Sequence, residues 1–102
     1  MNANAAKLSE EQVRERLADL PGWEIEDGRL TREFQFSDFT HAFGFMAAVA
    51  TLAQAMDHHP DWSNSYATVA VALSSHDVGG LSGRDFALAG KMDELAAPFG
   101  GG

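Results

Sequence analysis

Three of the four histidines of this chain lie in two short polar segments, Asp-His-His-Pro at residues 57–60 and Ser-Ser-His-Asp at residues 74–77. Imidazole is the side chain whose ordinary pKa allows it to accept or donate a proton near neutral pH. Each segment follows an apolar stretch, so both are expected where a secondary-structure element ends and a loop begins. The pattern indicates general acid–base catalysis. Histidines that are simply exposed in loops are the alternative interpretation.

A metal site is the main chemical competitor to acid–base catalysis. Its ligands would come from the same two segments: His58, His59, His76 and either Asp57 or Asp77. Adjacent side chains diverge by about 100° on a helix and point to opposite faces of a strand, whereas metal-binding pairs usually fall at positions i and i+4. The spacing disfavours such a site, and we expect no metal.

The composition argues against several further chemistries. The chain has 102 residues and no cysteine, which removes thiolate nucleophiles, disulfides, and zinc or iron–sulfur sites built on cysteine. Ser74, Ser75 and Ser82 lack the strand–turn–helix setting of a nucleophilic serine. A phosphate site at Gly79-Gly80 is a weak prediction, because a tight turn explains the same pair.

Charge and length narrow the possible partners and the domain organisation. Seven Lys and Arg against fifteen Asp and Glu give a formal net charge of −8, which disfavours unspecific binding to nucleic acid or to anionic membranes. Residues 1–7 are small and polar, so no signal peptide is predicted and we expect a cytoplasmic protein. A chain of this length supports one core. We predict a single domain over residues 1–102, with residues 1–7 and 99–102 flexible.

The hydrophobic pattern predicts an α+β fold with the element order α-β-β-α-β-β-α. The predicted elements are a helix from Ser9 that ends at Pro21, strands on either side of Asp27-Gly28, a helix over residues 38–56 with Ser37 as its N-cap, strands over 62–66 and 68–74, a loop over 75–81, and a helix that starts at Ser82. These elements predict a four-stranded antiparallel sheet with three helices packed on one face.

The predicted long helix has no charged Asp, Glu, Lys or Arg between residues 39 and 56. Its polar and small residues still make it too polar for a membrane span, so we expect no membrane. Two apolar stripes run along it: Phe39, Phe43, Met46 and Ala50 form one, and Phe45, Val49, Leu52 and Met56 form the other. A domain this small has few elements to cover both stripes. We predict a homo-oligomer in which the stripe of Phe45 contacts another subunit. A wide core face within one subunit is the alternative.

Three further residues have both structural and functional interpretations. Trp62 can fill the edge of the core or pack against a planar heterocycle beside the paired histidines. Asp85 lies three residues after Ser82, where it can complete a helix capping box, and support of a site is its second interpretation. His41 falls in the first turn of the long helix and is expected at the surface.

Several motifs taken together carry a resemblance to a known family: Phe43-Gly44-Phe45-Met46, Asp57-His58-His59-Pro60-Asp61-Trp62, Tyr66, Ser75-His76-Asp77, Gly80-Leu81-Ser82 and Arg84-Asp85. With these motifs the chain resembles the pterin-4a-carbinolamine dehydratases over nearly its whole length. The run His-His-Pro-acid-Trp, followed at the family's distance by Ser or Thr-His-acid and then by Gly-Leu and Asp, is specific.

The resemblance implies an enzyme that removes water from a 4a-hydroxytetrahydropterin to give a quinonoid dihydropterin. That substrate is the product left by a pterin-dependent aromatic amino acid hydroxylase, which is therefore a possible partner. His58 and His76 are implied as the acid–base pair, with His59 orienting the pterin. Implied substrate contacts are Asp57, His58, His59, Ser74, Ser75, His76 and Asp77, with Trp62 beside them and Asp85 holding a histidine in place. No cofactor is implied, because the pterin is the substrate.

Two positions depart from the family pattern. Ser75 stands where the family commonly has threonine, and it keeps the hydroxyl. Gln54 stands where better-known members have glutamate, and it loses a charge. If that carboxylate helps to bind the pterin, this chain binds it more weakly or prefers a differently substituted one.

The resemblance also implies a dimer or tetramer formed through the long helix. Animal relatives act as coactivators that use the same helical surface to bind the dimerisation region of a transcription factor. The main alternative function is therefore a helical-interface binding partner in which the dehydratase site is secondary. A metal-dependent lyase ranks last.

Overall fold

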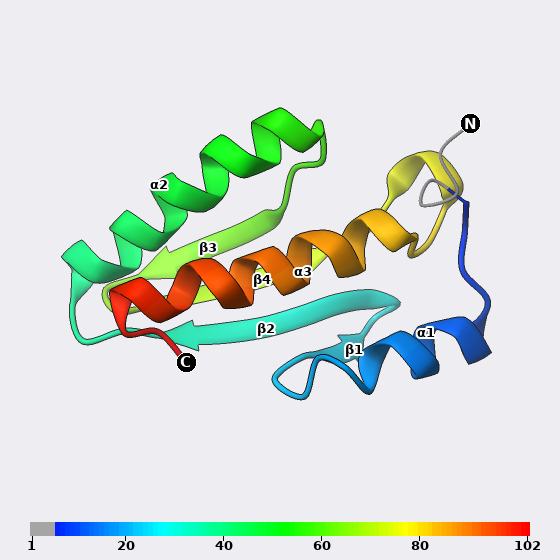
Figure 1. The fold of residues 1–102 in the computed structure, drawn as a ribbon, viewed down its shortest axis with the longest axis horizontal. Coiled ribbons are helices and arrows are strands. Elements are labelled where there is room, and N and C mark those ends of the chain that lie inside the picture. Colours follow the sequence, from blue (N-terminus) through cyan, green and yellow to red (C-terminus); the bar gives the residue numbers. More distant parts are fainter. Residues whose placement is uncertain (1–5) are drawn as a thin grey trace.

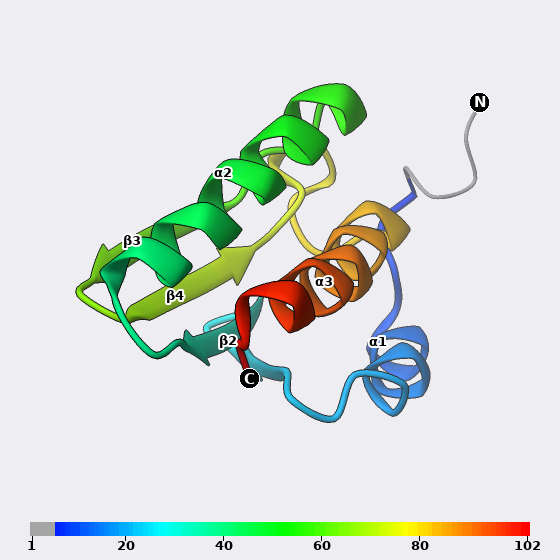
Figure 2. The ribbon, with the colours of Figure 1, turned by 60° about the vertical axis from the view of Figure 1, so that its left-hand side comes forward.

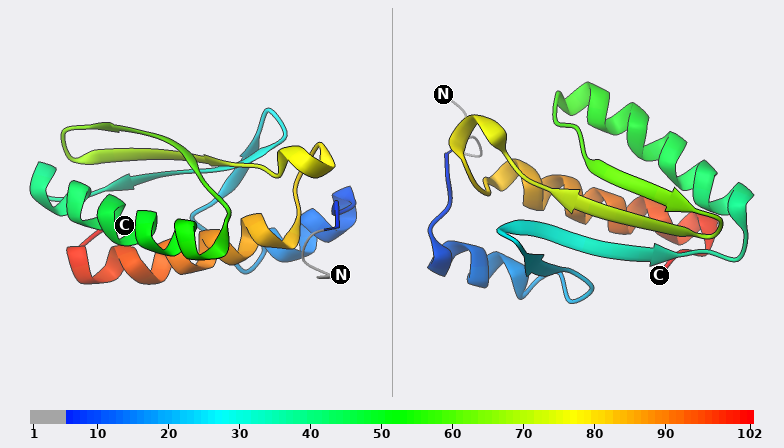
Figure 3. Two further views of the ribbon diagram at one scale, coloured as in Figure 1. Left: turned by 90° about the horizontal axis from the view of Figure 1, so that it is seen from above. Right: turned by 180° about the vertical axis from the view of Figure 1, so that it is seen from behind.

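A four-stranded antiparallel sheet in the order β1-β2-β4-β3 forms one layer of the protein, and three α-helices form the other (Figure 1). The computed structural model describes residues 6–102. Its strands are β1 (Glu24–Glu26), β2 (Arg29–Gln35), β3 (Asp61–Ser65) and β4 (Thr68–Leu73), and its helices are α1 (Glu10–Leu17), α2 (Phe39–Met56) and α3 (Gly83–Ala96), with short 3-10 turns η2 (His76–Val78) and η3 (Ala97–Phe99). The helices lie on one face of the sheet, as Figures 2 and 3 show. The predicted fold class is confirmed.

Turn chemistry and side-chain alternation determine the sheet. Asp27 and Gly28 connect β1 to β2 with φ angles of 53° and 75°, the left-handed pair that a two-residue hairpin requires. Along the central strand β4, the burial alternates so that Val69, Val71 and Leu73 are buried against the helices. The predicted hairpin is confirmed, and β4 lies within the strand predicted over residues 68–74.

The core lies between the sheet and helices α2 and α3. Phe34 of β2 is fully buried, and its ring centroid lies 4.8 Å from that of Phe45 on α2 and 5.8 Å from that of Trp23. Leu88 and Met92 of α3 are also fully buried in the same cluster. The aromatic rings therefore join the hairpin, the long helix and the last helix into one core.

The two apolar stripes of α2 take the opposite roles to those predicted. Phe45 and Val49 are completely buried against the sheet, whereas Phe39 and Phe43 are 49% and 56% exposed. The prediction that the Phe45 stripe meets another subunit is wrong, because this stripe supplies the core of the chain itself. The stripe of Phe39 is the uncovered one. Periodicity identifies two stripes on a helix, but it does not say which of them faces the sheet.

The start of α2 differs from the prediction by one residue. Asp38, rather than Ser37, is the N-cap of α2, and its Oδ1 accepts a hydrogen bond from the His41 N–H at 2.8 Å. The flexibility of residues 99–102 stays a prediction, and in the structure Gly102 exchanges two backbone hydrogen bonds with Gln35. Phe99 packs on the core, close to Gly44 of α2, where a Cβ atom would come within 2.6 Å of its ring.

At the start of the chain, residues 1–5 lie outside the described residues, and the flexibility of residues 1–7 stays a prediction. Lys7 forms a β-bridge with Ser82, and the Leu8 N–H donates to the Leu81 carbonyl at 2.8 Å. This short pairing joins the segment before α1 to the loop before α3.

By length and composition alone, α2 is long and apolar enough to cross a membrane. Core helices of soluble proteins meet the same criterion, and α2 packs Ala42, Phe45, Val49 and Ala53 into the interior of the domain. The absence of a membrane partner therefore stays a prediction from the sequence.

Replacement of Phe45 by alanine tests which stripe is the core. Because the Phe45 side chain is completely buried, Phe45→Ala should lower the free energy of unfolding by about 3–5 kcal/mol. Urea denaturation followed by circular dichroism measures this loss. Ile25→Ala removes a half-exposed apolar side chain from β1 and should change the same quantity by less than about 0.5 kcal/mol. Equal effects of the two substitutions would contradict the assignment.

Candidate active site

The end of α2 turns the paired histidines in different directions. Asp57 is the C-cap in the left-handed conformation, with φ of 52°, and its N–H donates to the carbonyls of Ala53 and Gln54. The His58 N–H also donates to the Ala53 carbonyl, at 3.1 Å. After this turn His58 is buried and His59 is exposed. The two adjacent histidines thus lie in different environments: His58 is buried and His59 is at the surface.

His58 is anchored by a buried carboxylate from α3. Its Nε2 lies 2.6 Å from Oδ1 of Asp85, and the side chains are 8% and 0% exposed. The other carboxylate oxygen of Asp85, Oδ2, accepts from the Ser75 hydroxyl at 2.8 Å and from the Ser82 backbone N–H at 3.0 Å. Asp85 therefore has both of the roles considered from the sequence. It completes the capping box of α3, and it holds a histidine.

The hydrogen bonds continue from Asp85 to the segment that carries His76. Ser75 is 1% exposed, and its Oγ lies 2.7 Å from Oγ of Ser82. The Arg84 side chain donates from Nε to Ser82 Oγ at 3.1 Å and from Nη2 to Asp77 Oδ1 at 2.7 Å. Because Ser75 and His58 share one carboxylate, residues 57–60 and 74–77 lie side by side. The structure brings together the two segments that are far apart in the sequence.

The remaining predicted site residues lie around this network with fewer contacts. His59 is exposed, and its Nε2 lies 3.0 Å from Oε1 of Gln54. His76 is exposed in η2, Ser74 is half-buried, and Asp57 is exposed. Trp62 is half-buried on β3 opposite Val71 and packs against the core. Thus His58 is held firmly, whereas His59 and His76 present their rings at the surface.

His41 lies apart from these residues, at the other end of α2. It is exposed, and its Nδ1 lies 2.6 Å from Oδ1 of Asp38, the N-cap. The predicted surface position of His41 is confirmed.

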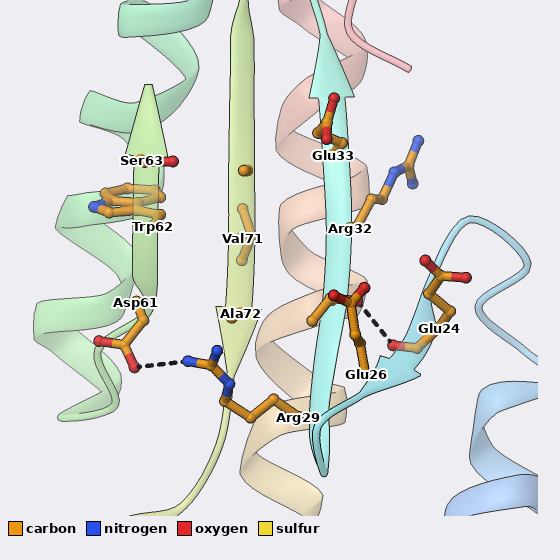
Figure 4. A pocket seen from close by; sticks show the side chains of 12 residues that line it. Glu24, Glu26, Arg29, Arg32, Glu33, Asp61, Trp62, Ser63, Val71 and Ala72 are labelled. Carbon is orange, nitrogen blue, oxygen red and sulfur yellow. Dashed lines mark hydrogen bonds and ion pairs between the residues drawn. The ribbon is translucent and has the colours of Figure 1, made fainter. Parts of the chain in front are cut away.

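Two hollows in the described part of the chain have no histidine among their lining residues. The larger, about 410 Å³, opens on the sheet face that carries no helices and has Ala70 and Ala72 of β4 among its lining residues (Figure 4). Acidic side chains of β1, β2 and β3 surround it, and Arg29 and Asp61 form an ion pair there at 3.9 Å. Trp62 is among its lining residues, whereas none of the histidines is. The network around His58 therefore lies outside both hollows.

Within residues 6–102, no three side chains of histidine, aspartate or glutamate are grouped so that they could hold a metal ion. In the candidate site, the buried carboxylate of Asp85 is hydrogen-bonded to His58, Ser75 and Ser82. Its oxygen atoms serve as hydrogen-bond acceptors for protein groups.

Known proteins resemble this chain over most of its length. A family model described as pterin 4 alpha carbinolamine dehydratase matches residues 6–95. The chain belongs to this dehydratase family. A protein from Rhodospirillum rubrum is 56% identical over 91 residues, which cover 87% of this chain and 95% of that protein. One from Afipia carboxidovorans is 55% identical over 95 residues, with 91% and 95% covered. Both are named as pterin-4-alpha-carbinolamine dehydratases, which are hydro-lyases.

A solved structure shares the fold of this dehydratase family member. The crystal structure of a Brucella melitensis protein, described as a transcriptional coactivator/pterin dehydratase, matches with a TM-score of 0.85 and 44% sequence identity. The match covers 88% of this chain and 98% of that one. The family resemblance inferred from the histidine motifs is therefore confirmed.

The contribution of Arg84 to this family member's site was missed at the level of the sequence. The motif Arg84-Asp85 supports the resemblance, but nothing in the pattern says that Arg84 folds back to Ser82 and Asp77. A helix cap followed two residues later by arginine is the signal that could have suggested it. Arg84 is half-buried, and it links the start of α3 to η2.

The hydrogen bond from Arg84 lowers the pKa of the Asp77 carboxyl, and the positive charge of Arg84 acts in the same direction. Arg84→Met should therefore raise this pKa towards the ordinary aspartate value, as measured by a carboxyl carbon NMR titration. Because the folded-state pKa is lowered, the interaction stabilises the fold above about pH 4 and is lost as the pH falls through the lowered value. Lys91→Met is a matched control, because Lys91 pairs with Glu94 in the later part of α3. An unchanged Asp77 pKa in Arg84→Met would contradict this origin of the shift.

Proposed function

We propose that this protein removes water from a 4a-hydroxytetrahydropterin and releases a quinonoid dihydropterin. Membership of the dehydratase family supports the class of reaction. The observation that carries the proposal is the imidazole of His58, held by the buried Asp85 at 2.6 Å beside the segment that contains His76. This arrangement offers two imidazoles for a reaction that needs two proton transfers.

The chemistry of water loss assigns the roles. The 4a-hydroxyl takes a proton and leaves as water with the electron pair of the C4a–O bond, while the neighbouring ring nitrogen loses its proton as the C=N bond forms. We assign His58 and His76 to these two transfers and His59 to the orientation of the pterin. One imidazole ends protonated and the other deprotonated, and exchange with water restores both. Each of the two transfers thus has its own imidazole.

The neighbouring residues would complete the binding site. Asp57, Ser74 and Asp77 border the histidines in the chain, and the expected contact of Trp62 with the flat ring stays a prediction from the sequence. Ser75 was predicted as a substrate contact, but its hydroxyl is buried and bonded to Asp85 and Ser82. We therefore assign Ser75 to the support of His58 rather than to direct contact with the pterin.

The same proposal places the protein in the recycling of pterins in the cytoplasm, with an aromatic amino acid hydroxylase as the source of the substrate. The reaction as written needs no added cofactor, because the pterin itself carries the leaving group and the ring nitrogen. The expected cytoplasmic location and the hydroxylase partner stay predictions from the sequence.

The dehydratase activity can be tested with a substrate that is generated in place. A pterin-dependent hydroxylase produces the 4a-hydroxy compound, and its absorbance decay is followed with and without this protein. The wild type should accelerate the decay, and His58→Ala and His76→Ala should each lose about 10²- to 10⁴-fold of this acceleration.

His41→Ala is the matched control for these variants, because His41 is an exposed histidine whose ring bonds Asp38 at the start of α2. It should retain wild-type activity. No acceleration by the wild type would overturn the proposed function. Full activity of both His58→Ala and His76→Ala would overturn the assignment of the two proton transfers.

We further propose that the exposed stripe of α2 joins copies of this chain into a homodimer or homotetramer. Phe39 and Phe43 are 49% and 56% exposed, and their ring centroids lie 5.8 Å apart. Met46 follows on the same side of the helix and is half-buried. Large apolar side chains grouped on one helix face are typical of an interface, because their burial between subunits removes apolar surface from water.

Phe43→Glu tests this oligomer. The substitution introduces a charge into the exposed stripe and should give a folded monomer, whereas the wild type should scatter light as a dimer or larger assembly. Ile25→Glu places the same charge on another exposed apolar residue, on β1, and should leave the mass unchanged. A monomeric wild type would contradict the proposal.

A further inference from the structure

A chain of hydrogen bonds runs from Arg84 through Ser82, Ser75 and Asp85 to His58. The donors and acceptors along this chain determine the position of each proton. At its outer end, Oγ of Ser82 accepts from the backbone N–H of Arg84 at 3.2 Å and from its Nε–H at 3.1 Å. A hydroxyl oxygen has two lone pairs, and arginine only donates. Both lone pairs of Ser82 are therefore used, and its own proton must point to the next oxygen in the chain.

That next oxygen is Oγ of Ser75, 2.7 Å away. Ser75 has one hydroxyl proton, and it donates this proton to Oδ2 of Asp85 at 2.8 Å. Oδ2 also accepts from the Ser82 backbone N–H at 3.0 Å. Two donors are thus directed at Oδ2, which accepts from both of them, and a carboxylate can only accept.

The remaining oxygen of Asp85, Oδ1, lies 2.6 Å from Nε2 of His58. Because the carboxylate has no proton to give, the proton between these two atoms belongs to Nε2. The tautomer of a histidine follows from the partners of its nitrogens. His58 in its neutral form is thus the Nε2–H tautomer, with its lone pair on Nδ1.

Nδ1 is the nitrogen that can exchange a proton with a bound molecule. Among residues 6–102 it has no hydrogen-bond partner in the protein. The described part of the chain contains no buried side-chain nitrogen or oxygen without such a partner, so Nδ1 of His58 reaches the surface.

We propose that the hydrogen-bond chain Arg84, Ser82, Ser75 and Asp85 fixes His58 as the Nε2–H tautomer, so that all proton transfer by His58 occurs at Nδ1. In this proposal Asp85, Ser75, Ser82 and Arg84 are positioning residues. The catalytic part of the statement rests on the dehydratase function proposed above, whereas the tautomer itself does not.

Asp85→Asn tests the proposal because it should reverse the tautomer while keeping the shape of the side chain. The amide oxygen must face the two donors from Ser75 and Ser82, so the amide NH2 faces Nε2 of His58. Nε2 then has to accept, and the proton moves to Nδ1. The lone pair needed at Nδ1 is lost, and the dehydratase rate should fall by at least about 10²-fold.

Nitrogen-15 NMR of the labelled histidine ring measures the tautomer independently of activity. At a pH where His58 is neutral, the wild type should show a protonated Nε2 and an unprotonated Nδ1, and Asp85→Asn should show the reverse. A wild-type His58 that carries its proton on Nδ1 would overturn the proposal. If the wild type shows the Nε2–H tautomer but no dehydratase activity, the proposed function fails and the tautomer assignment holds.

Two further variants separate positioning from a general loss of structure. Ser75→Thr keeps the hydroxyl and should retain activity and the Nε2–H tautomer, whereas Ser75→Ala removes the donor to Asp85 and should lower the rate. Asp93→Asn is the matched control for Asp85→Asn, because Asp93 is a carboxylate of the same helix that bonds Trp23 and Arg32. It should leave both the His58 tautomer and the rate unchanged. Equal activity of Ser75→Thr and Ser75→Ala would count against a positioning role for this hydroxyl.

Discussion

The buried carboxylate of Asp85 is the constraint on which the candidate site depends. A charged group that is completely buried is costly unless it is fully hydrogen-bonded, and Asp85 accepts from three groups in three different parts of the chain. The three donors are the backbone N–H of Ser82 at the N-cap of α3, the hydroxyl of Ser75 shortly after β4, and the imidazole of His58 after α2. The carboxylate that starts a helix thus also determines where the histidine lies, so the fold and the site share the same atoms.

The long helix α2 serves two purposes that its sequence pattern does not separate. Its inner stripe packs Phe45 against Phe34, and its end delivers His58 to Asp85 through the left-handed turn at Asp57. Its outer stripe, with Phe39 and Phe43, stays uncovered within one chain. An assembly built on that outer stripe would stiffen the helix whose end carries the two adjacent histidines.

Local signals in the sequence were sufficient for the fold, because they act over a few residues. Asp27-Gly28 predicted the hairpin, and Ser82 with Asp85 predicted the cap of α3. The predictions failed where distant parts of the chain decide the outcome. Which stripe of α2 faces the sheet depends on Phe34 from another element. The burial of Ser75, likewise, is set by its contact with α3 rather than by its neighbours in the sequence.

In the proposed reaction, the different surroundings of His58 and His59 support proton transfer by the first and orientation of the pterin by the second. Nε2 of His58 is bonded to the carboxylate of Asp85, whose other oxygen accepts from Ser75 and Ser82. Only Nδ1 of His58 is therefore left to react. His59 is exposed and bonded to Gln54, whose amide can offer either its oxygen or its NH2 group after a simple rotation. Either tautomer of His59 is therefore satisfied at little cost. A glutamate at position 54 would accept only, and would favour the tautomer with a proton on the bonded nitrogen. The glutamine thus leaves both tautomers of the His59 ring available.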